Sequence, residues 1–151
     1  MRLVEANPQR TVIELSETEW TFFQELLHRY PLVPNEEREL TRQSEGDEFD
    51  ADTELLRTNL EDLTATNQKR LHEWLHNPAT FTQSGDHGNL TIQASDRDWL
   101  LQILNDLRVG SWQQLGRPDT TAINELELGA KNFRALWCME LTGLLQSFLL
   151  R

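Results

Sequence analysis

One segment, Ser95–Leu115, constrains the fold of this chain more than any other. Ser95 is a favourable N-cap residue, and Asp98 three positions later completes a capping-box pattern. The pattern predicts a helix over 96–115 with one broad apolar face, which other elements must cover. The apolar residues of this face recur at steps of three and four, the spacing of one side of an α-helix: Trp99, Leu100, Ile103, Leu104 and Leu107.

The last apolar segment predicts a second long helix, over about 130–150. A helix that is apolar nearly all round is central to a fold or forms half of a dimer interface, and we favour the central position. We therefore predict a mainly α fold, a bundle of four to five helices around the 96–115 and 130–150 pair. The predicted stripe is Phe133, Trp137, Leu141, Leu144 and Phe148, widened by Leu136, Met139, Leu145 and Leu149.

The N-terminal segment predicts a small β-hairpin. Residues 2–6 and 10–15 are short and rich in β-branched or aliphatic residues, and the Asn-Pro pair at 7–8 is typical of a turn. Residues 79–94 contain one or two further short alternating pieces around a Gly-rich turn. We expect these to form strands that add to the hairpin.

A marked helix start follows the hairpin. Ser16 is the expected N-cap, Glu19 closes a capping box, and Leu15 with Trp20 has the spacing of a hydrophobic staple. Pro31 is expected to end the helix, because proline cannot continue it. The predicted buried stripe is Trp20, Phe23, Leu26, Leu27 and Tyr30.

Residues 52–76 predict one helix or two short ones, because the central TATNQ is a weak helix former. Asn67 occupies a gap on the apolar side. Gly110 lies inside the predicted helix 96–115, although glycine has a low helix propensity. Either a neighbouring helix approaches closely there, or the helix breaks at this position. The predicted apolar face of 52–76 is Leu56, Leu60, Leu63, Leu71, Trp74 and Leu75.

Charge and length limit the possible partners. The 151 residues predict one domain, 1–151, with an acidic loop at about 31–51. Residues 36–62 hold 11 acidic residues against three arginines, which is typical of a solvated connector or of an acidic binding surface. The formal net charge of −11 argues against nucleic acid and anionic membrane as partners. The start of the chain has no signal-peptide pattern, so we expect a cytoplasmic protein.

One motif matches a metal site in spacing. His72, Glu73 and His76 form H-E-x-x-H on a predicted helix, the arrangement with which zinc peptidases hold the metal and activate a water molecule. A third ligand has no recognisable position, and Pro78 ends the helix shortly after His76. The motif therefore has two interpretations, a solvent-exposed edge of a helix and the metal site of a zinc hydrolase. The remaining side chains that could supply a ligand are His87, Glu125, Glu127 and Glu140.

Other signatures of enzymes do not occur in the sequence. It contains no G-x-S-x-G, Walker A or dinucleotide fingerprint, and its one cysteine, Cys138, lies in an apolar helical segment where a buried, inert thiol is expected. The polar set Asn105, Asp106 and Arg108 forms a recognition spot or pairs across helices and with water. We assign no catalytic, cofactor-binding or metal-ligating residue.

The 96–115 segment also carries a resemblance. Its W-L-x-x-x-L-N-D-L-R-x-G pattern, from Trp99 to Gly110, followed by Leu115-Gly116, resembles a bacterial family of small, mainly helical proteins labelled as a domain of unknown function. The N-terminal hairpin before a helix and the aromatic final helix also fit. The acidic stretch and the HEWLH segment lie outside the pattern. Genes of that family often lie beside the gene for the Clp protease adaptor, which implies a link to protein turnover and assigns no residue a role.

These observations favour a non-enzymatic protein-interaction role in the cytosol, linked to proteolysis. We expect an unidentified protein partner, no nucleic acid, no membrane, and a monomer or homodimer. The alternative is a zinc-dependent hydrolase using His72, Glu73 and His76. Glu73→Gln separates the two, because a hydrolase would lose turnover and keep its metal, whereas an interaction protein would keep partner binding.

Overall fold

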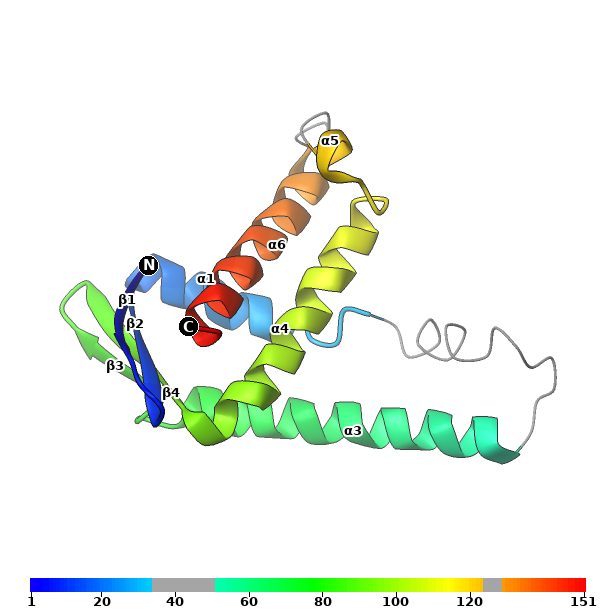
Figure 1. Ribbon diagram of the computed structural model, residues 1–151, viewed down its shortest axis with the longest axis horizontal. Coiled ribbons are helices and arrows are strands. Elements are labelled where there is room, and N and C mark those ends of the chain that lie inside the picture. Colours follow the sequence, from blue (N-terminus) through cyan, green and yellow to red (C-terminus); the bar gives the residue numbers. More distant parts are fainter. Residues whose placement is uncertain (34–50, 124–128) are drawn as a thin grey trace.

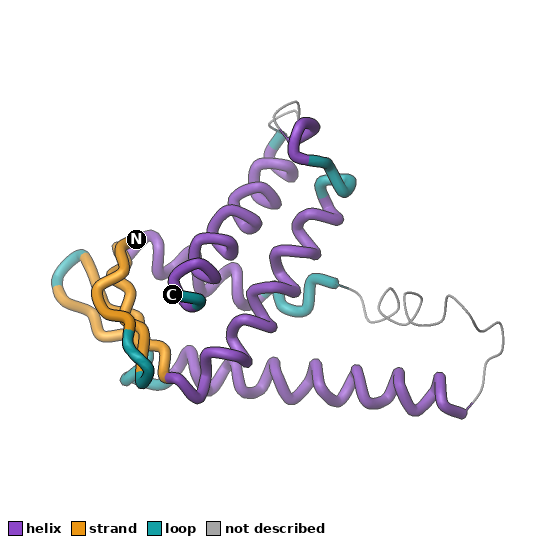
Figure 2. The backbone as a smooth tube through the Cα atoms, viewed as in Figure 1, coloured by secondary structure: helices purple, strands orange, loops and turns teal. Residues whose placement is uncertain are grey.

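The computed structural model describes residues 1–33, 51–123 and 129–151. Over this part the chain is mainly helical and carries one antiparallel sheet (Figures 1 and 2). The mainly helical fold that the sequence predicts is confirmed at this level. The elements are β1 (Arg2–Ala6), β2 (Arg10–Ser16), α1 (Glu17–His28), α3 (Ala51–His76), β3 (Phe81–Ser84), β4 (His87–Gln93), α4 (Ala94–Gln114), the single turn α5 (Thr120–Ile123) and α6 (Ala130–Leu149).

The predicted hairpin is part of a four-stranded sheet. β1 pairs with β2, β2 with β4 and β4 with β3, all antiparallel, so the strands predicted within 79–94 do add to the hairpin. Ile13 lies opposite Leu90, and Thr11 lies opposite Ile92. Alternate residues of β2 and β4 point to one face of the sheet, where they are fully buried against the helices. These residues are Ile13, Leu15, Leu90 and Ile92.

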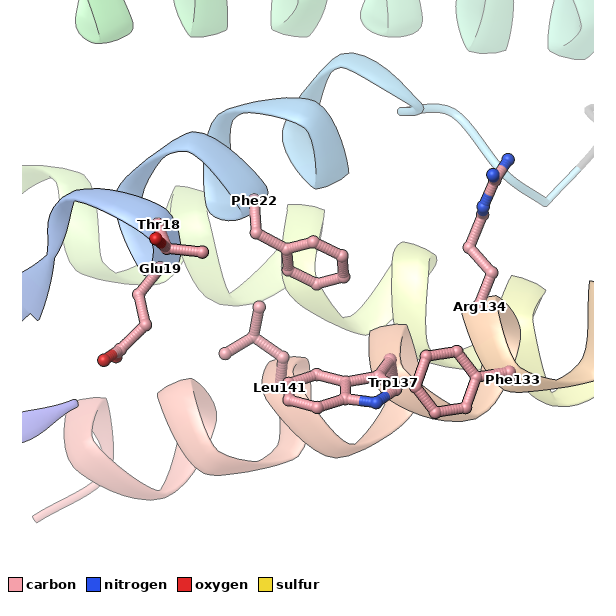
Figure 3. A pocket seen from close by; sticks show the side chains of 7 residues that line it. All are labelled: Thr18, Glu19, Phe22, Phe133, Arg134, Trp137 and Leu141. Atoms are coloured by element: carbon pink, nitrogen blue, oxygen red, sulfur yellow. The ribbon is translucent and has the colours of Figure 1, made fainter. Parts of the chain in front are cut away.

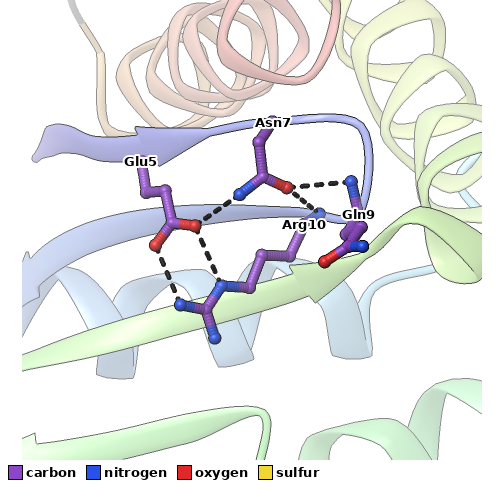
Figure 4. Close-up of polar contacts among 4 residues, drawn as sticks. All are labelled: Glu5, Asn7, Gln9 and Arg10. Carbon is purple, nitrogen blue, oxygen red and sulfur yellow. Dashed lines mark hydrogen bonds and ion pairs between the residues drawn. The ribbon is translucent and has the colours of Figure 1, made fainter.

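The turn between β1 and β2 has the polar chemistry that the Asn-Pro pair predicts (Figure 4). The Asn7 side-chain oxygen accepts hydrogen bonds from the backbone N–H of Gln9, at 2.8 Å, and of Arg10, at 2.9 Å. The Arg10 guanidinium donates two hydrogen bonds to the Glu5 carboxylate, and these bonds lower the pKa of Glu5. The turn therefore fixes the register of the hairpin through local side-chain contacts.

Of the two predicted N-cap residues, Ser16 is confirmed and Ser95 is not. The Ser16 hydroxyl accepts a hydrogen bond from the Glu19 backbone N–H at 3.1 Å, so the predicted cap of α1 is confirmed. The predicted cap at Ser95 is wrong. β4 continues directly into α4, whose N-cap is Gln93 without a side-chain hydrogen bond. The Ala94 N–H instead donates to the carbonyl oxygen of Gln9, so the turn between β1 and β2 supplies an acceptor for the start of the helix.

The predicted apolar face of α4 is confirmed, because all of its residues are between 0% and 6% exposed: Trp99, Leu100, Ile103, Leu104 and Leu107. α4 packs along α6, and α1 and the sheet also contact it (Figure 1). Trp74 of α3 lies edge-on against Trp99, with ring centroids 5.9 Å apart. α4 is therefore the helix around which the other described elements gather.

Gly110 lies inside α4, and the helix does not break there. A Cβ atom on Gly110 would lie 2.6 Å from the Cβ of Leu32, so the glycine admits a close neighbour. This neighbour is the segment after α1 and not another helix. One turn earlier, the buried Asp106 carboxylate accepts hydrogen bonds from the backbone N–H of Leu32, at 2.7 Å, and of Val33, at 3.3 Å.

α3 is one helix from Ala51 to His76, so the weak TATNQ sequence does not divide it. Its buried residues, Thr64, Asn67, Leu71, Trp74 and Leu75, all lie in its second half. The first half projects from the other described elements (Figure 1). Leu63 is 50% exposed there, and Leu56 and Leu60 are only partly buried, so this part of the predicted apolar face is wrong. The acidic stretch 36–62 lies outside the described residues up to position 50 and in this half of α3 from 51 onward.

The predicted stripe of α6 is only half correct. Leu141 and Phe148 are buried, whereas Phe133, Trp137 and Leu144 are 51%, 50% and 42% exposed. The buried side is completed by residues near the stripe or beyond it: Ala135, Cys138, Thr142, Leu145 and Leu149. One side of α6 is therefore buried in the core, as its predicted central position requires, and the other side is exposed. No helix of the described residues combines the length and the apolarity that a membrane crossing requires.

Candidate functional site

The exposed aromatic side chains of α6 form one wall of an apolar groove, and α1 forms the other wall (Figure 3). The groove encloses a cavity of about 510 Å³. Its apolar lining consists of Phe22 from α1 with Phe133, Trp137 and Leu141 from α6. Thr18 and Glu19 lie at one end of this row and Arg134 at the other.

The aromatic rings of the groove hold one another in place. Phe22 contacts Trp137 edge-on, with ring centroids 5.7 Å apart and planes at 70°, and Phe133 lies 6.0 Å from Trp137. These are the separations and angles that aromatic pairs prefer. The Trp137 ring is therefore oriented by its neighbours while half of its surface remains open to solvent.

The groove continues along α1 through two adjoining cavities that share Phe22. One, of about 370 Å³, is lined by Glu17, Thr18, Thr21, Phe22 and Glu25. The other, of about 400 Å³, is lined by Phe22, Glu25, Leu26, Arg29, Arg134 and Cys138. Thr18 and Glu19 lie toward the Leu141 side of the row (Figure 3), and Arg29 and Arg134 both line the second adjoining cavity.

The Cys138 thiol is buried at the floor of this groove. The side chain is fully buried, and its sulfur lies 3.8 Å from the carbonyl oxygen of Leu107 on α4. Burial raises the pKa of the thiol, because desolvation disfavours the thiolate that nucleophilic chemistry needs. The expected inert thiol agrees with this geometry, and the groove offers apolar contact there and no nucleophile.

The two ends of the groove carry different charges. At one end the Glu19 carboxylate lies 2.7 Å from the Met1 amine, and Glu17 is exposed. Burial raises the pKa of Glu19, but the hydrogen bond and the charge of the Met1 amine outweigh it, with help from Ser16, and the pKa is lowered. Arg29 and Arg134 lie at the other end, together with Glu25.

Within the described residues, the H-E-x-x-H side chains are not part of a cluster that could hold a metal ion. His72 and His76 are exposed at the end of α3, their ring centroids are 4.1 Å apart, and the His76 Nδ1–H donates to the His72 carbonyl oxygen. His87 is on β4 beside Asp86, and Glu140 is on α6. Glu125 and Glu127 lie outside the described residues. Within residues 1–33, 51–123 and 129–151, no three His, Cys, Asp or Glu side chains gather closely enough to hold a metal ion.

The polar set on α4 has a structural role at two of its positions. Asp106 is buried and binds the backbone after α1, as described above. The Arg108 guanidinium donates to the side-chain oxygen of Gln146 on α6 at 3.2 Å, and Asn105 is exposed. Pairing between elements therefore accounts for Asp106 and Arg108, and the set does not line the groove.

Sequence reasoning missed the groove because it treated each helix separately. Phe22 is not part of the predicted buried stripe of α1, although it follows Thr18 by four residues and so shares a face with it. An aromatic side chain outside the buried stripe was the available signal. Comparison with family models, with curated proteins and with solved structures finds no match to this chain.

Proposed function

We propose that this protein is a non-enzymatic interaction module of the cytosol whose α1–α6 groove binds an apolar helical face of a protein. The observation that carries the proposal is the pair Phe133 and Trp137, each half exposed, beside Phe22 and Leu141. Exposed aromatic side chains in a contiguous apolar groove are typical of interfaces, and tryptophan is enriched among residues that dominate binding energy.

The shape and chemistry of the groove favour a protein over a small polar ligand. Small-molecule sites combine apolar walls with a few convergent polar groups that orient the ligand. In this groove the charged groups, Glu19 and Arg134, stand at opposite ends of an apolar row. A helix that presents apolar residues at three- and four-residue spacing matches such a row.

The resemblance to the bacterial family adds a narrower proposal, that the partner belongs to the machinery of protein turnover. The gene neighbourhood of that family is the basis for it. The zinc hydrolase remains a prediction from the motif. No observation in the described chain favours it over the interaction role.

Site-specific photo-crosslinking tests the groove as a docking site. A benzophenone side chain is placed at Phe133, and in a matched variant at Leu63, which is equally exposed on α3. We expect adducts to one defined polypeptide segment from position 133 and not from position 63. Excess unlabelled wild-type protein is expected to compete for the adduct, whereas excess Trp137→Glu is not, because a charge in an apolar contact costs binding energy.

Equal labelling from both positions, or competition by Trp137→Glu as strong as by the wild type, would overturn the proposal. Identification of the labelled segment by mass spectrometry tests the narrower proposal. A segment from a protease, a protease adaptor or a substrate of one supports the link to turnover, and a segment from a different protein outside that machinery contradicts it.

A further inference from the structure

Resting on the proposed function, we propose that the helix bound in the groove is α6 of a second copy of this chain. The two α6 helices would lie antiparallel about a two-fold axis at Trp137. In a symmetric dimer the same patch serves on both copies, so the patch must be complementary to itself when it is reversed. The groove meets this requirement in its apolar row and in its charges.

The apolar row is centred on Trp137. Phe133 lies one helical turn before it and Leu141 one turn after it, and all three line the same cavity. Reversal about Trp137 places Phe133 level with Leu141 of the second copy and each Trp137 beside the other. Leu144, 42% exposed, lies on the same side of the helix and extends the apolar contact. One contact of this kind would cover the exposed stripe on both chains at once.

The charges are complementary under the same reversal. Glu17 and Glu19 with the Met1 ammonium give one net negative charge at one end, and Arg29 and Arg134 with Glu25 give one net positive charge at the other. Arg134 is three residues from the axis, about 4.5 Å along the helix. It is therefore level with residue 140 of the second copy, next to Leu141, which shares its cavity with Thr18 and Glu19. Opposite charges meet at both ends.

The densest stretch of acidic residues lies outside the groove. Of the 25 acidic residues, 11 lie within 36–62, and none of the residues that line the groove belongs to that stretch. The repulsion between two copies that each carry −11 is therefore spread over other surfaces and is screened by salt. A second copy is an occupant that the groove matches in both apolar contact and charge.

Sedimentation and light scattering of the full chain test the dimer. We expect a mass twice the 17.6 kDa of the chain at high concentration and the mass of one chain on dilution. Trp137→Glu is expected to raise the dimer dissociation constant at least about 100-fold, because it places a charge at the centre of the contact. Leu63→Glu, at an equally exposed apolar position, is expected to leave the constant unchanged.

A charge exchange tests the antiparallel arrangement itself. Arg134→Glu and Glu17→Arg, each alone, place like charges together at both ends of the dimer, and each is expected to weaken it about tenfold. An equimolar mixture restores opposite charges at both ends, so we expect heterodimers with nearly the wild-type constant. Thermal unfolding confirms that both variants fold, and loss of α6 hydrogen-exchange protection on dilution of the wild-type protein gives a readout without any mutation.

The results distinguish this inference from the function on which it rests. A wild-type chain that stays monomeric at all concentrations overturns the dimer, and a mixture no tighter than the single variants overturns its antiparallel arrangement about Trp137. If position 133 then crosslinks a different protein, the groove remains a docking site and only its occupant changes. If position 133 crosslinks neither a second copy nor another protein, both proposals fail.

Discussion

α4 and α6 lie side by side and are similar in length, with 21 and 20 residues, yet their predicted apolar faces have different environments. Every residue of the predicted face of α4 is buried. In α6, which has more apolar residues, three of the five stripe residues are at least 42% exposed. Apolar content therefore does not determine burial, and the number of neighbouring elements does.

The neighbours explain the difference. α4 contacts α6, α1 and β4, and Trp99 on its first turns also packs against Trp74 of α3. α6 packs mainly on α4, and its C-terminal half contacts β1. Its remaining side meets α1 only through the open groove. The comparison predicts that a substitution on α4 lowers the free energy of unfolding of the isolated chain more than the equivalent substitution on α6.

The largest effect is expected for Trp99→Ala. The ring is 6% exposed, contacts Trp74, and has the Arg70 guanidinium 4.4 Å from its centroid. Truncation leaves a cavity in the core, so we expect a loss of about 3–5 kcal/mol in the free energy of unfolding, measured by chemical denaturation.

Trp99→Phe is the matched control. Nε1 of Trp99 is buried without a hydrogen-bond partner in the described part of the chain, so phenylalanine keeps most of the ring and removes an unpaired donor. We expect a change below about 1.5 kcal/mol. A loss below about 1 kcal/mol for Trp99→Ala would mean that α4 is not the enclosed helix described above.

An intermediate effect is expected for Asp106→Ala. The substitution leaves the N–H groups of Leu32 and Val33 without their carboxylate acceptor in a buried site, at a cost of about 2–4 kcal/mol in the free energy of unfolding. The neighbouring Asn105→Ala, at an exposed position of the same helix, is expected to change it by less than about 0.5 kcal/mol. Similar losses for the two variants would contradict the role of Asp106.

The smallest effect is expected for Trp137→Ala, the counterpart of Trp99→Ala on α6. Half of the ring is already exposed, so its removal is expected to cost about 1–2 kcal/mol, well below the cost at Trp99, when unfolding is measured on dilute, monomeric protein. If two copies associate through the groove as proposed, the wild-type protein gains stability at high concentration and the variant does not. A loss as large as that of Trp99→Ala in dilute protein would show that both helices are equally enclosed.

Local signals were the part of the fold that the sequence predicted well. The apolar face of α4, the Ser16 cap and the hairpin turn each depend on residues close together in the chain. The cap predicted at Ser95 was wrong because the helix begins directly after β4, where the Gln9 carbonyl oxygen in the β1–β2 turn accepts the Ala94 N–H. The burial predicted for Leu63 and Trp137 was wrong because periodicity identifies the apolar side of a helix but not the element that covers it.

The groove was not predictable for the same reason. Its walls, Phe22 and Trp137, are 115 positions apart in the sequence, and only the packing of α1 across α6 brings them together. The H-E-x-x-H spacing correctly placed two imidazoles on one helix. Spacing within a helix carries no information about a third ligand from elsewhere, and the described residues do not supply one.

The segment just after α1 is attached at three points: the Tyr30 hydroxyl accepts from the Asn67 side chain on α3, and the backbone N–H groups of Leu32 and Val33 donate to Asp106 of α4. These attachments tie the end of α1 to α3 and to α4, the helix on which α6 packs. A receptor whose walls are fixed before binding spends little conformational entropy on closing around its ligand. If a partner binds in the groove as proposed, its association rate would be governed by the frequency of correctly oriented collisions and not by a prior opening step.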